Sequence, residues 1–114
     1  MTDDCIFCKI VNKEIPVDIV HEDEDFLAFN DIKPKASVHI IMIPKRHYGP
    51  HFTLSEENTE VMGKMMITAA EIAREAGIDR SGYRLVINSG PDSGMEVDHL
   101  HLHILGGNKL GPIA

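Results

Sequence analysis

The sequence lacks any apolar run close to the ~20 residues that cross a bilayer. Residues 1–5 lack the basic flank and the apolar stretch of a secretion signal. The chain also contains no repeat, low-complexity tract or linker. These absences predict a cytoplasmic protein with no membrane partner.

Positive charge is also scarce, because 11 lysines and arginines stand against 18 aspartates and glutamates and leave a net charge of −7. A protein that holds nucleic acid through its phosphates needs the opposite balance, so we expect no nucleic-acid partner. A mononucleotide is not excluded, because a pocket on an acidic protein can still be locally favourable to an anion.

Only two cysteines are present, and Cys5 and Cys8 form a C-x-x-C motif. In the absence of a secretion signal this pair does not predict a structural disulfide. Redox chemistry, metal binding and simple packing remain open for it.

The hydrophobic pattern of the 114 residues predicts a single domain, residues 1–114. It indicates a short helix at 5–12, strands at 18–21, 26–29, 37–43, 83–87 and about 98–105, and a long helix at 55–76. Ser55 alone, or Thr53 with Glu56, would cap the long helix, and Gly77 would end it. We therefore expect an α+β fold in which one long and one short helix accompany a mostly antiparallel five-stranded sheet.

The last predicted strand carries three alternate histidines, His99, His101 and His103. Successive side chains of a strand point to opposite faces, so the three imidazoles share one face while residues 100, 102 and 104 enter the core. A solvated face normally carries Lys, Glu, Thr or Ser. Three imidazoles in alternate positions therefore indicate a functional row.

Such a row suits either metal binding or phosphorus chemistry. On a strand His99 and His103 start ~13 Å apart, whereas zinc holds a nitrogen ligand at ~2.1 Å. One zinc ion therefore cannot bind all three rings. A neutral imidazole, with an ordinary pKa of ~6.5, is a nucleophile at neutral pH, which favours attack on phosphorus.

Residues 99–105 (HLHLHIL) resemble the signature of the histidine triad nucleotide-binding proteins, and so do the segments 6–10, 14–16, 27–29, 31–32, 43–47 and 88–90. Residues 105–107 (LGG) are similar to the Hint branch of that family rather than the Fhit branch. The resemblance implies a homodimer with one continuous sheet. It also implies a phosphoramidase that cleaves purine nucleoside monophosphate conjugates through a nucleotidyl-histidine intermediate, with no cofactor needed for catalysis.

The same resemblance assigns catalytic roles to the three histidines. His101 would be the nucleophile. The carbonyl of His99 would hold its far ring nitrogen and leave the attacking nitrogen unprotonated. His103 would contact the phosphoryl oxygens or help to protonate the leaving amine.

Phosphate binding falls, by resemblance, on Asn88 and on the loop around Gly94, where backbone N–H groups can stabilise charge on the oxygens. Glu96 stands where some relatives carry a serine that contacts the leaving group. A carboxylate donates no hydrogen bond unless it is protonated, but it attracts an ammonium group, so the leaving-group preference stays open.

The nucleoside part of the substrate would meet a second set of residues. Asp31 would bind the ribose hydroxyls, with a plain turn residue as the alternative. Phe7, Phe29 and Ile32 would line the base pocket, although the two phenylalanines taken alone favour core packing.

A structural zinc site is also implied, since some relatives hold zinc with two cysteines and two histidines. The corresponding residues are Cys5, Cys8, His47 and His99, a common Cys₂His₂ set. Two reduced cysteines that merely pack near the first helix are the alternative. The sequence assigns no chemistry to the remaining histidines: His21 and His51 are predicted at the surface and His39 at the edge of the core.

Three other functions remain open at this point. One is hydrolysis of dinucleoside polyphosphates, which the ending at residues 105–107 disfavours. Another is a nucleotide-binding module that acts mainly through protein partners. The third is a metal or redox protein centred on Cys5 and Cys8.

Overall fold

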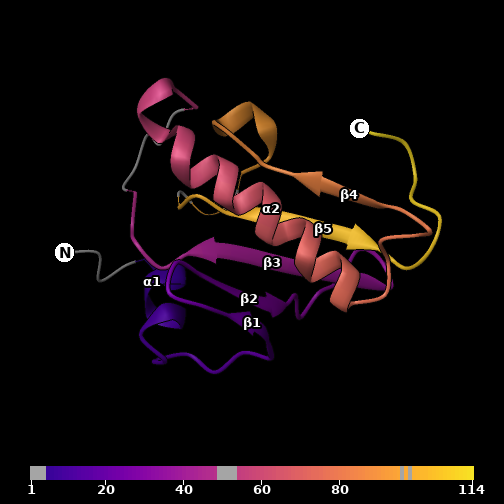
Figure 1. Cartoon of the computed structure of the whole chain (residues 1–114), viewed down its shortest axis with the longest axis horizontal. Helices are drawn as coiled ribbons and strands as arrows, with labels where there is room; N and C mark the ends of the chain where they lie inside the picture. Colours follow the sequence, from indigo (N-terminus) through magenta and orange to yellow (C-terminus); the bar gives the residue numbers. More distant parts are fainter. Residues whose placement is uncertain (1–4, 49–53, 96, 98) are drawn as a thin grey trace.

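The computed structural model describes residues 5–48, 54–95, 97 and 99–114, and within them five strands form one antiparallel sheet. The strand order is β1-β2-β3-β5-β4 (Figure 1). The strands are β1 (Ile19–Glu22), β2 (Phe26–Asn30), β3 (Val38–Pro44), β4 (Tyr83–Val86) and β5 (Leu102–Gly106). The predicted α+β fold with a five-stranded antiparallel sheet is therefore confirmed.

Strand β3 lies at the centre of the sheet and is buried along almost its whole length. It pairs with β2 on one side, where Ala28 faces Met42, and with β5 on the other, where Ile41 faces His103. Its β-branched, apolar sequence suits a strand that is covered on both faces.

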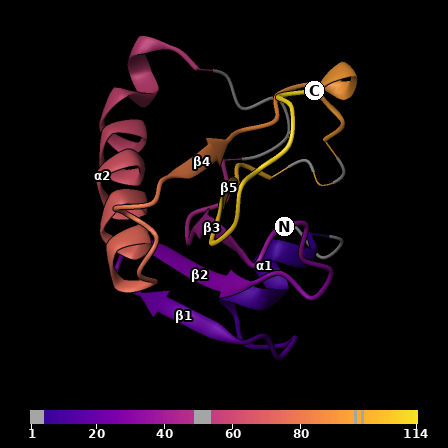
Figure 2. The same ribbon diagram turned by 90° about the vertical axis from the view of Figure 1, so that its right-hand side faces the viewer.

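A helix lies on each face of this sheet (Figure 2). Helix α2 (Thr59–Glu75) covers one face with a buried stripe that includes Met65, Ala69 and Ile72. The short helix α1 (Ile6–Val11) covers part of the opposite face with Phe7 and Ile10. No helix in the described ranges has the length and hydropathy needed to cross a membrane.

The start of the long helix differs from the prediction. Residues Glu56–Asn58 form a 3₁₀ turn, and the α-helix begins only at Thr59. Ser55 has an extended backbone but makes no side-chain capping hydrogen bond, and Thr53 lies outside the described residues. A 3₁₀ turn is common at the start of an α-helix, where the first amides have no partner within the helix. The helix does end before Gly77, whose φ of 76° is readily adopted only by glycine.

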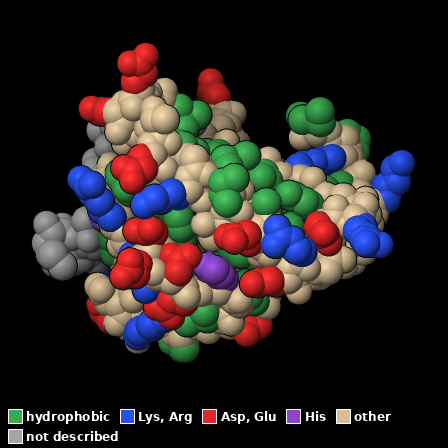
Figure 3. All heavy atoms as spheres, viewed as in Figure 1, with side chains coloured by type: hydrophobic (Ala, Val, Ile, Leu, Met, Phe, Trp, Pro, Cys, Tyr) green, Lys and Arg blue, Asp and Glu red, His purple; other side chains and the backbone are tan. Residues whose placement is uncertain are grey.

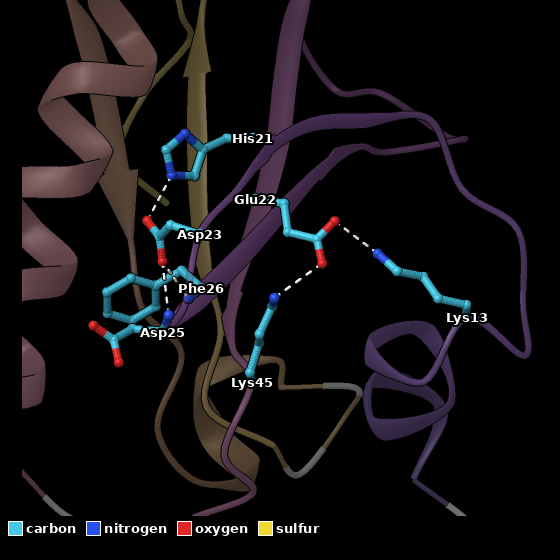
Figure 4. A network of polar contacts seen from close by, with 7 residues as sticks. All are labelled: Lys13, His21, Glu22, Asp23, Asp25, Phe26 and Lys45. Atoms are coloured by element: carbon cyan, nitrogen blue, oxygen red, sulfur yellow. Dashed lines mark hydrogen bonds and ion pairs between the residues drawn. The ribbon is translucent and has the colours of Figure 1, made fainter.

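The acidic turn between β1 and β2 is held by its own side chains (Figure 4). One Asp23 oxygen accepts hydrogen bonds from the backbone amides of Asp25 and Phe26, both at 2.8 Å. Glu22 contacts Lys13 at 2.7 Å and Lys45 at 2.9 Å, and these two cations lower the pKa of its carboxyl. The turn thus ties β1 to the segment after α1 and to the end of β3.

Candidate active site

The histidine row does not lie wholly within a strand. We predicted a strand at about 98–105, but β5 starts at Leu102, so His99 and His101 precede it. The reason is local: the His99 carbonyl accepts a hydrogen bond from the His101 ring at 2.7 Å, so this carbonyl is not used in a strand ladder. The predicted alternation is nevertheless confirmed, because Leu100, Leu102 and Ile104 are all buried in the core under α2.

A cavity of about 490 Å³ lies on the opposite face, next to α1. Apolar side chains from α1 and from the segment after it form one end. Polar groups from β3, from the end of β2 and from β5 form the other. The lining includes Ile6, Phe7, Ile10, Ile15, Val17, Phe29, Asp31, Ile32, Lys35, His39, Gly94, His101 and His103.

His101 is buried, and its tautomer follows from its partner. Because a carbonyl only accepts, His101 Nδ1 must donate its proton to the His99 oxygen. A neutral ring has one proton, so Nε2 carries the lone pair. The ring is held by the edge of Phe7, 5.1 Å away between centroids, and by His103 at the same separation. The arrangement supplies an oriented nitrogen nucleophile.

His103 lies beside a histidine to which the sequence assigned no chemistry. His39 Nε2 is 2.9 Å from His103 Nδ1 and 3.5 Å from an Asp31 oxygen. Burial, with the neighbouring rings of His101 and His39, lowers the pKa of His103 to about 4. Burial also lowers the pKa of His39, against the opposing effect of Asp31. Both rings are therefore neutral at neutral pH.

Asp31 serves two contacts with its two oxygens. One oxygen accepts a hydrogen bond from the Lys33 amide at 2.9 Å, which is a turn-forming contact. The other faces His39 in the cavity. The turn role and a pocket role are thus compatible in the same side chain.

A second polar cluster lies at the start of α1. The Cys5 and Cys8 sulfurs lie 3.0–3.7 Å from Nδ1 of His47 and of His99, and these two nitrogens are 3.1 Å apart. A tetrahedral zinc with bonds of ~2.3 Å to sulfur and ~2.05 Å to nitrogen would separate its ligands by about 3.3–3.8 Å. The four residues therefore form a possible metal-binding cluster of the right donor type and size.

The charge states of this cluster also fit a cation. Burial and His47 lower the pKa of His99 to about 4, so its ring is neutral and offers a lone pair. Burial and the neighbouring Cys8 raise the pKa of the Cys5 thiol. Two thiolates side by side are unfavourable by themselves, and a divalent cation removes that cost.

A family profile described as "Scavenger mRNA decapping enzyme C-term binding" matches residues 4–112. The "Purine nucleoside phosphoramidase" of Escherichia coli K12 is 43% identical over 113 residues, 99% of this chain and 95% of that protein. The structure of a histidine triad protein from Clostridium difficile aligns with a TM-score of 0.90 and 44% identity, covering 97% of this chain and 96% of that one. The chain belongs to the histidine triad family.

A metal-containing member of the histidine triad family is also similar to this chain. It is a zinc-bound protein from Mycobacterium smegmatis, with a TM-score of 0.76 and 33% identity, covering 97% of this chain and 82% of that one. The possible metal cluster of this chain is thus compatible with a fold that holds zinc elsewhere in the family.

Not every residue of the sequence-derived site lines the cavity. Gly94 does, with a φ of 83°, whereas Asn88 donates its side-chain amide to the Ser93 carbonyl at 2.8 Å and so shapes the loop. Ile32 lines the cavity but is 88% exposed, so it lies at the open side. Glu96 lies outside the described residues.

His39, predicted at the edge of the core with no chemistry assigned to it, lies at the cavity. It is only 4% exposed, and it contacts two cavity residues. A signal was present in the sequence: His39 has the same parity as Ile41 along β3, and Ile41 pairs with His103. The sequence does not show that β3 pairs with β5, and this pairing is what places the side chains of His39 and Ile41 on the same face as the histidine row. Of the other two, His21 contacts Asp23 near the surface and His51 lies outside the described residues.

Proposed function

We propose that the chain is a purine nucleoside phosphoramidase, a nucleotide hydrolase that acts through a nucleotidyl-histidine intermediate. The observation that carries the proposal is His101: its Nδ1–H is bound by the His99 carbonyl, and its other nitrogen is left with a lone pair in a ring that lines the cavity. The 43% identity with a protein of that name supports the choice of substrate class.

The reaction would proceed in two steps at phosphorus. The Nε2 lone pair of His101 forms a bond to the α-phosphorus while the phosphorus–nitrogen bond to the leaving amine breaks, and the amine takes up a proton from solvent, which the attacking water returns to solvent in the second step. Water then attacks the same phosphorus and breaks the bond to His101. The products are the amine, a nucleoside monophosphate and the free imidazole.

Neighbouring residues would stabilise and orient the substrate. His103 is neutral, with a pKa of about 4, which favours hydrogen bonding to a phosphoryl oxygen over delivery of a proton. The backbone around Gly94 would approach the same oxygens. The Asp31 oxygen that faces His39 in the cavity would accept from a ribose hydroxyl, and Phe7, Phe29 and Ile32 would contact the base.

Catalysis in this scheme needs no metal, and the Cys₂His₂ cluster would hold zinc for a structural purpose. When bound, zinc would fix the start of α1 relative to His47 and His99. Phe7 lies in α1, two residues after its N-cap Cys5, and contacts His101, so this anchoring would keep the cavity wall in place.

The protein would act as a homodimer. Strand β4 lies at the edge of the sheet and pairs with β5 alone among the described strands, which leaves its outer side for a second copy. On the face that carries α2 and β4, hydrophobic side chains gather across the middle (Figure 3). Met66 of α2 is a large apolar side chain that is 45% exposed.

A pair of substitutions tests the dimer. Met66→Glu should give a monomer at micromolar concentration in sedimentation experiments. Ile67→Glu is the matched control, because Ile67 is also exposed on α2 but lines a groove beside the β1–β2 turn, far from β4. A wild-type monomer would reject the dimer.

The same scheme predicts a cytoplasmic location with no nucleic-acid or membrane partner. Cys5 and Cys8 are free thiols within reach of one metal, an arrangement that suits a reducing compartment.

A comparison of two substrate classes tests the function as a whole. Adenosine 5′-phosphoramidate conjugates and diadenosine polyphosphates should be offered to the protein separately, without divalent metal. We expect turnover of the phosphoramidates at a kcat/KM at least tenfold higher. Preferred cleavage of the polyphosphates would support the other hydrolase class, and binding of AMP without turnover of either would support a binding module.

A further inference from the structure

The hydrogen bonds around His39 define which of its nitrogens carries a proton. The Lys35 backbone amide donates to His39 Nδ1 at 3.1 Å. An amide N–H is only a donor, so Nδ1 must accept with its lone pair. The single proton of the neutral ring therefore lies on Nε2.

This proton in turn fixes the tautomer of His103. His39 Nε2–H faces His103 Nδ1 at 2.9 Å, and the more distant Asp31 oxygen lies 3.5 Å away. His103 Nδ1 must accept, so the proton of the neutral His103 ring is on Nε2. That nitrogen is the one left for a ligand in the cavity.

The same three side chains also satisfy the distance criterion for a metal site, with Asp31, His39 and His103 offering ligand atoms within 4.8 Å. The Lys35 amide argues against that use. A metal bound at Nε2 of a neutral His39 would move the ring proton to Nδ1, where it would face the amide proton. The cluster is therefore better suited to a hydrogen-bond chain.

We propose that His39 is a positioning residue that holds His103 as a hydrogen-bond donor, through a chain that starts at the Lys35 backbone amide. This inference rests on the proposed function for its catalytic meaning. Two neighbouring imidazoles then have opposite tautomers: His101 keeps its proton on Nδ1 and His103 keeps its proton on Nε2. One ring offers a lone pair to phosphorus and the other offers an N–H to the phosphoryl oxygens.

The alternative tautomer would be harmful. With the proton on Nδ1, the Nε2 lone pair of His103 would face oxygens that gain negative charge in the transition state. The site would lose a donor and gain a repulsion. A backbone amide cannot change its proton, so the polarity of the chain is fixed by the fold.

Two amide substitutions separate the contacts of His39. In His39→Gln, the side-chain amide nitrogen replaces Nε2 and still donates toward His103. In His39→Asn, the shorter side chain replaces Nδ1 with an oxygen that accepts from Lys35, but no donor reaches His103. The two variants are similar in polarity and each keeps one of the two hydrogen bonds.

Nitrogen NMR of ¹⁵N-histidine-labelled full-length protein measures the tautomer directly, with the His103 signals identified by their loss in His103→Asn. In the wild type we expect His103 protonated at Nε2 and unprotonated at Nδ1. His39→Gln should keep this pattern, and His39→Asn should give a mixture of tautomers. A wild-type His103 with its proton on Nδ1 would overturn the proposal, and that spectrum decides the matter even if a variant fails to fold. Equal spectra for the two amide variants would overturn it too.

Kinetics supply the second readout. With an adenosine phosphoramidate, His39→Asn should lower kcat on the order of tenfold with KM little changed, less than the ~10²-fold cost of removing an oxyanion donor outright. His39→Gln should stay within about threefold of the wild type. If no variant and no wild type turned over this substrate, the proposed function would fail while the NMR result still stood. A drop of similar size in both variants would reject the positioning role.

Discussion

The two faces of the sheet use burial for different purposes. Between α2 and the sheet the buried side chains are mostly apolar, with Met42, Met65 and Leu102 fully inaccessible, and their burial stabilises the folded state. Beside α1, His39, His99 and His101 are almost as deeply buried. Burial of these rings costs stability unless each has a partner. One face thus stabilises the fold, and the other holds reactive groups in defined protonation states.

The contrast is sharpest within a single strand. Along β5, Leu102 and Ile104 enter the α2 core while His103, between them, enters the cavity. Substitutions on the two faces should therefore separate activity from stability.

The largest effect is expected at the nucleophile. His101→Asn should reduce phosphoramidate hydrolysis by at least ~10³-fold while AMP affinity is nearly retained, because the lone pair at phosphorus is lost but the cavity remains. Steady-state rates and calorimetric AMP binding measure the two effects. The wild type should also give an acid-labile nucleotide adduct on His101, and an adduct on another residue would contradict the mechanism.

On the opposite face, Met65→Ala should lower the free energy of unfolding by about 2–5 kcal/mol through the lost contacts and the cavity left behind. The kcat of the folded fraction should change less than about threefold, since Met65 faces the core from α2 and does not line the cavity. Urea denaturation and rate measurements at low temperature test this. A selective loss of kcat without loss of stability would break the division between the faces.

The metal cluster would serve both stability and the site, because bound zinc would stabilise α1 and the cavity wall together. Cys5→Ser should reduce bound zinc from about one per chain to a small fraction and lower the Tm. Elemental analysis of untagged protein prepared without chelator gives the metal content. Ser55→Ala, a small substitution at an exposed position without a capping bond, is the control. Unchanged metal content in the cysteine variant would rule the site out.

The smallest effect is a pH dependence of stability from His103. Its pKa is about 4 when folded and ~6.5 when unfolded, so the unfolded chain binds the extra proton first. The contribution is complete above about pH 6.5 and is lost as the pH falls toward 4. Between pH 7 and pH 4 the loss should be on the order of 3 kcal/mol.

Urea denaturation across that range measures this dependence, and His103→Asn should flatten it. The comparison uses only the slope of the free energy of unfolding against pH, and not the stability of the variant at pH 7. An identical slope in the wild type and in His103→Asn would show that the ring titrates alike in both states.

Much of the fold was accessible from the sequence. The alternation of Leu100, Leu102 and Ile104 placed the core correctly, and hydrophobic periodicity located both helices and all five strands. The ends of elements were less accessible. The 3₁₀ turn at Glu56–Asn58 and the late start of β5 depend on which amides and carbonyls find local hydrogen-bond partners, and hydrophobic periodicity does not report these partners.

The site divides in the same way. Local spacing determined the histidine row, the C-x-x-C pair and the family signature, because each is a short pattern with its own chemistry. Only the tertiary structure decided that His39 meets His103, since these residues are 64 positions apart and meet through the pairing of β3 with β5. It also decided the tautomers, because a proton on an imidazole follows the donor or acceptor that the folded backbone places beside it.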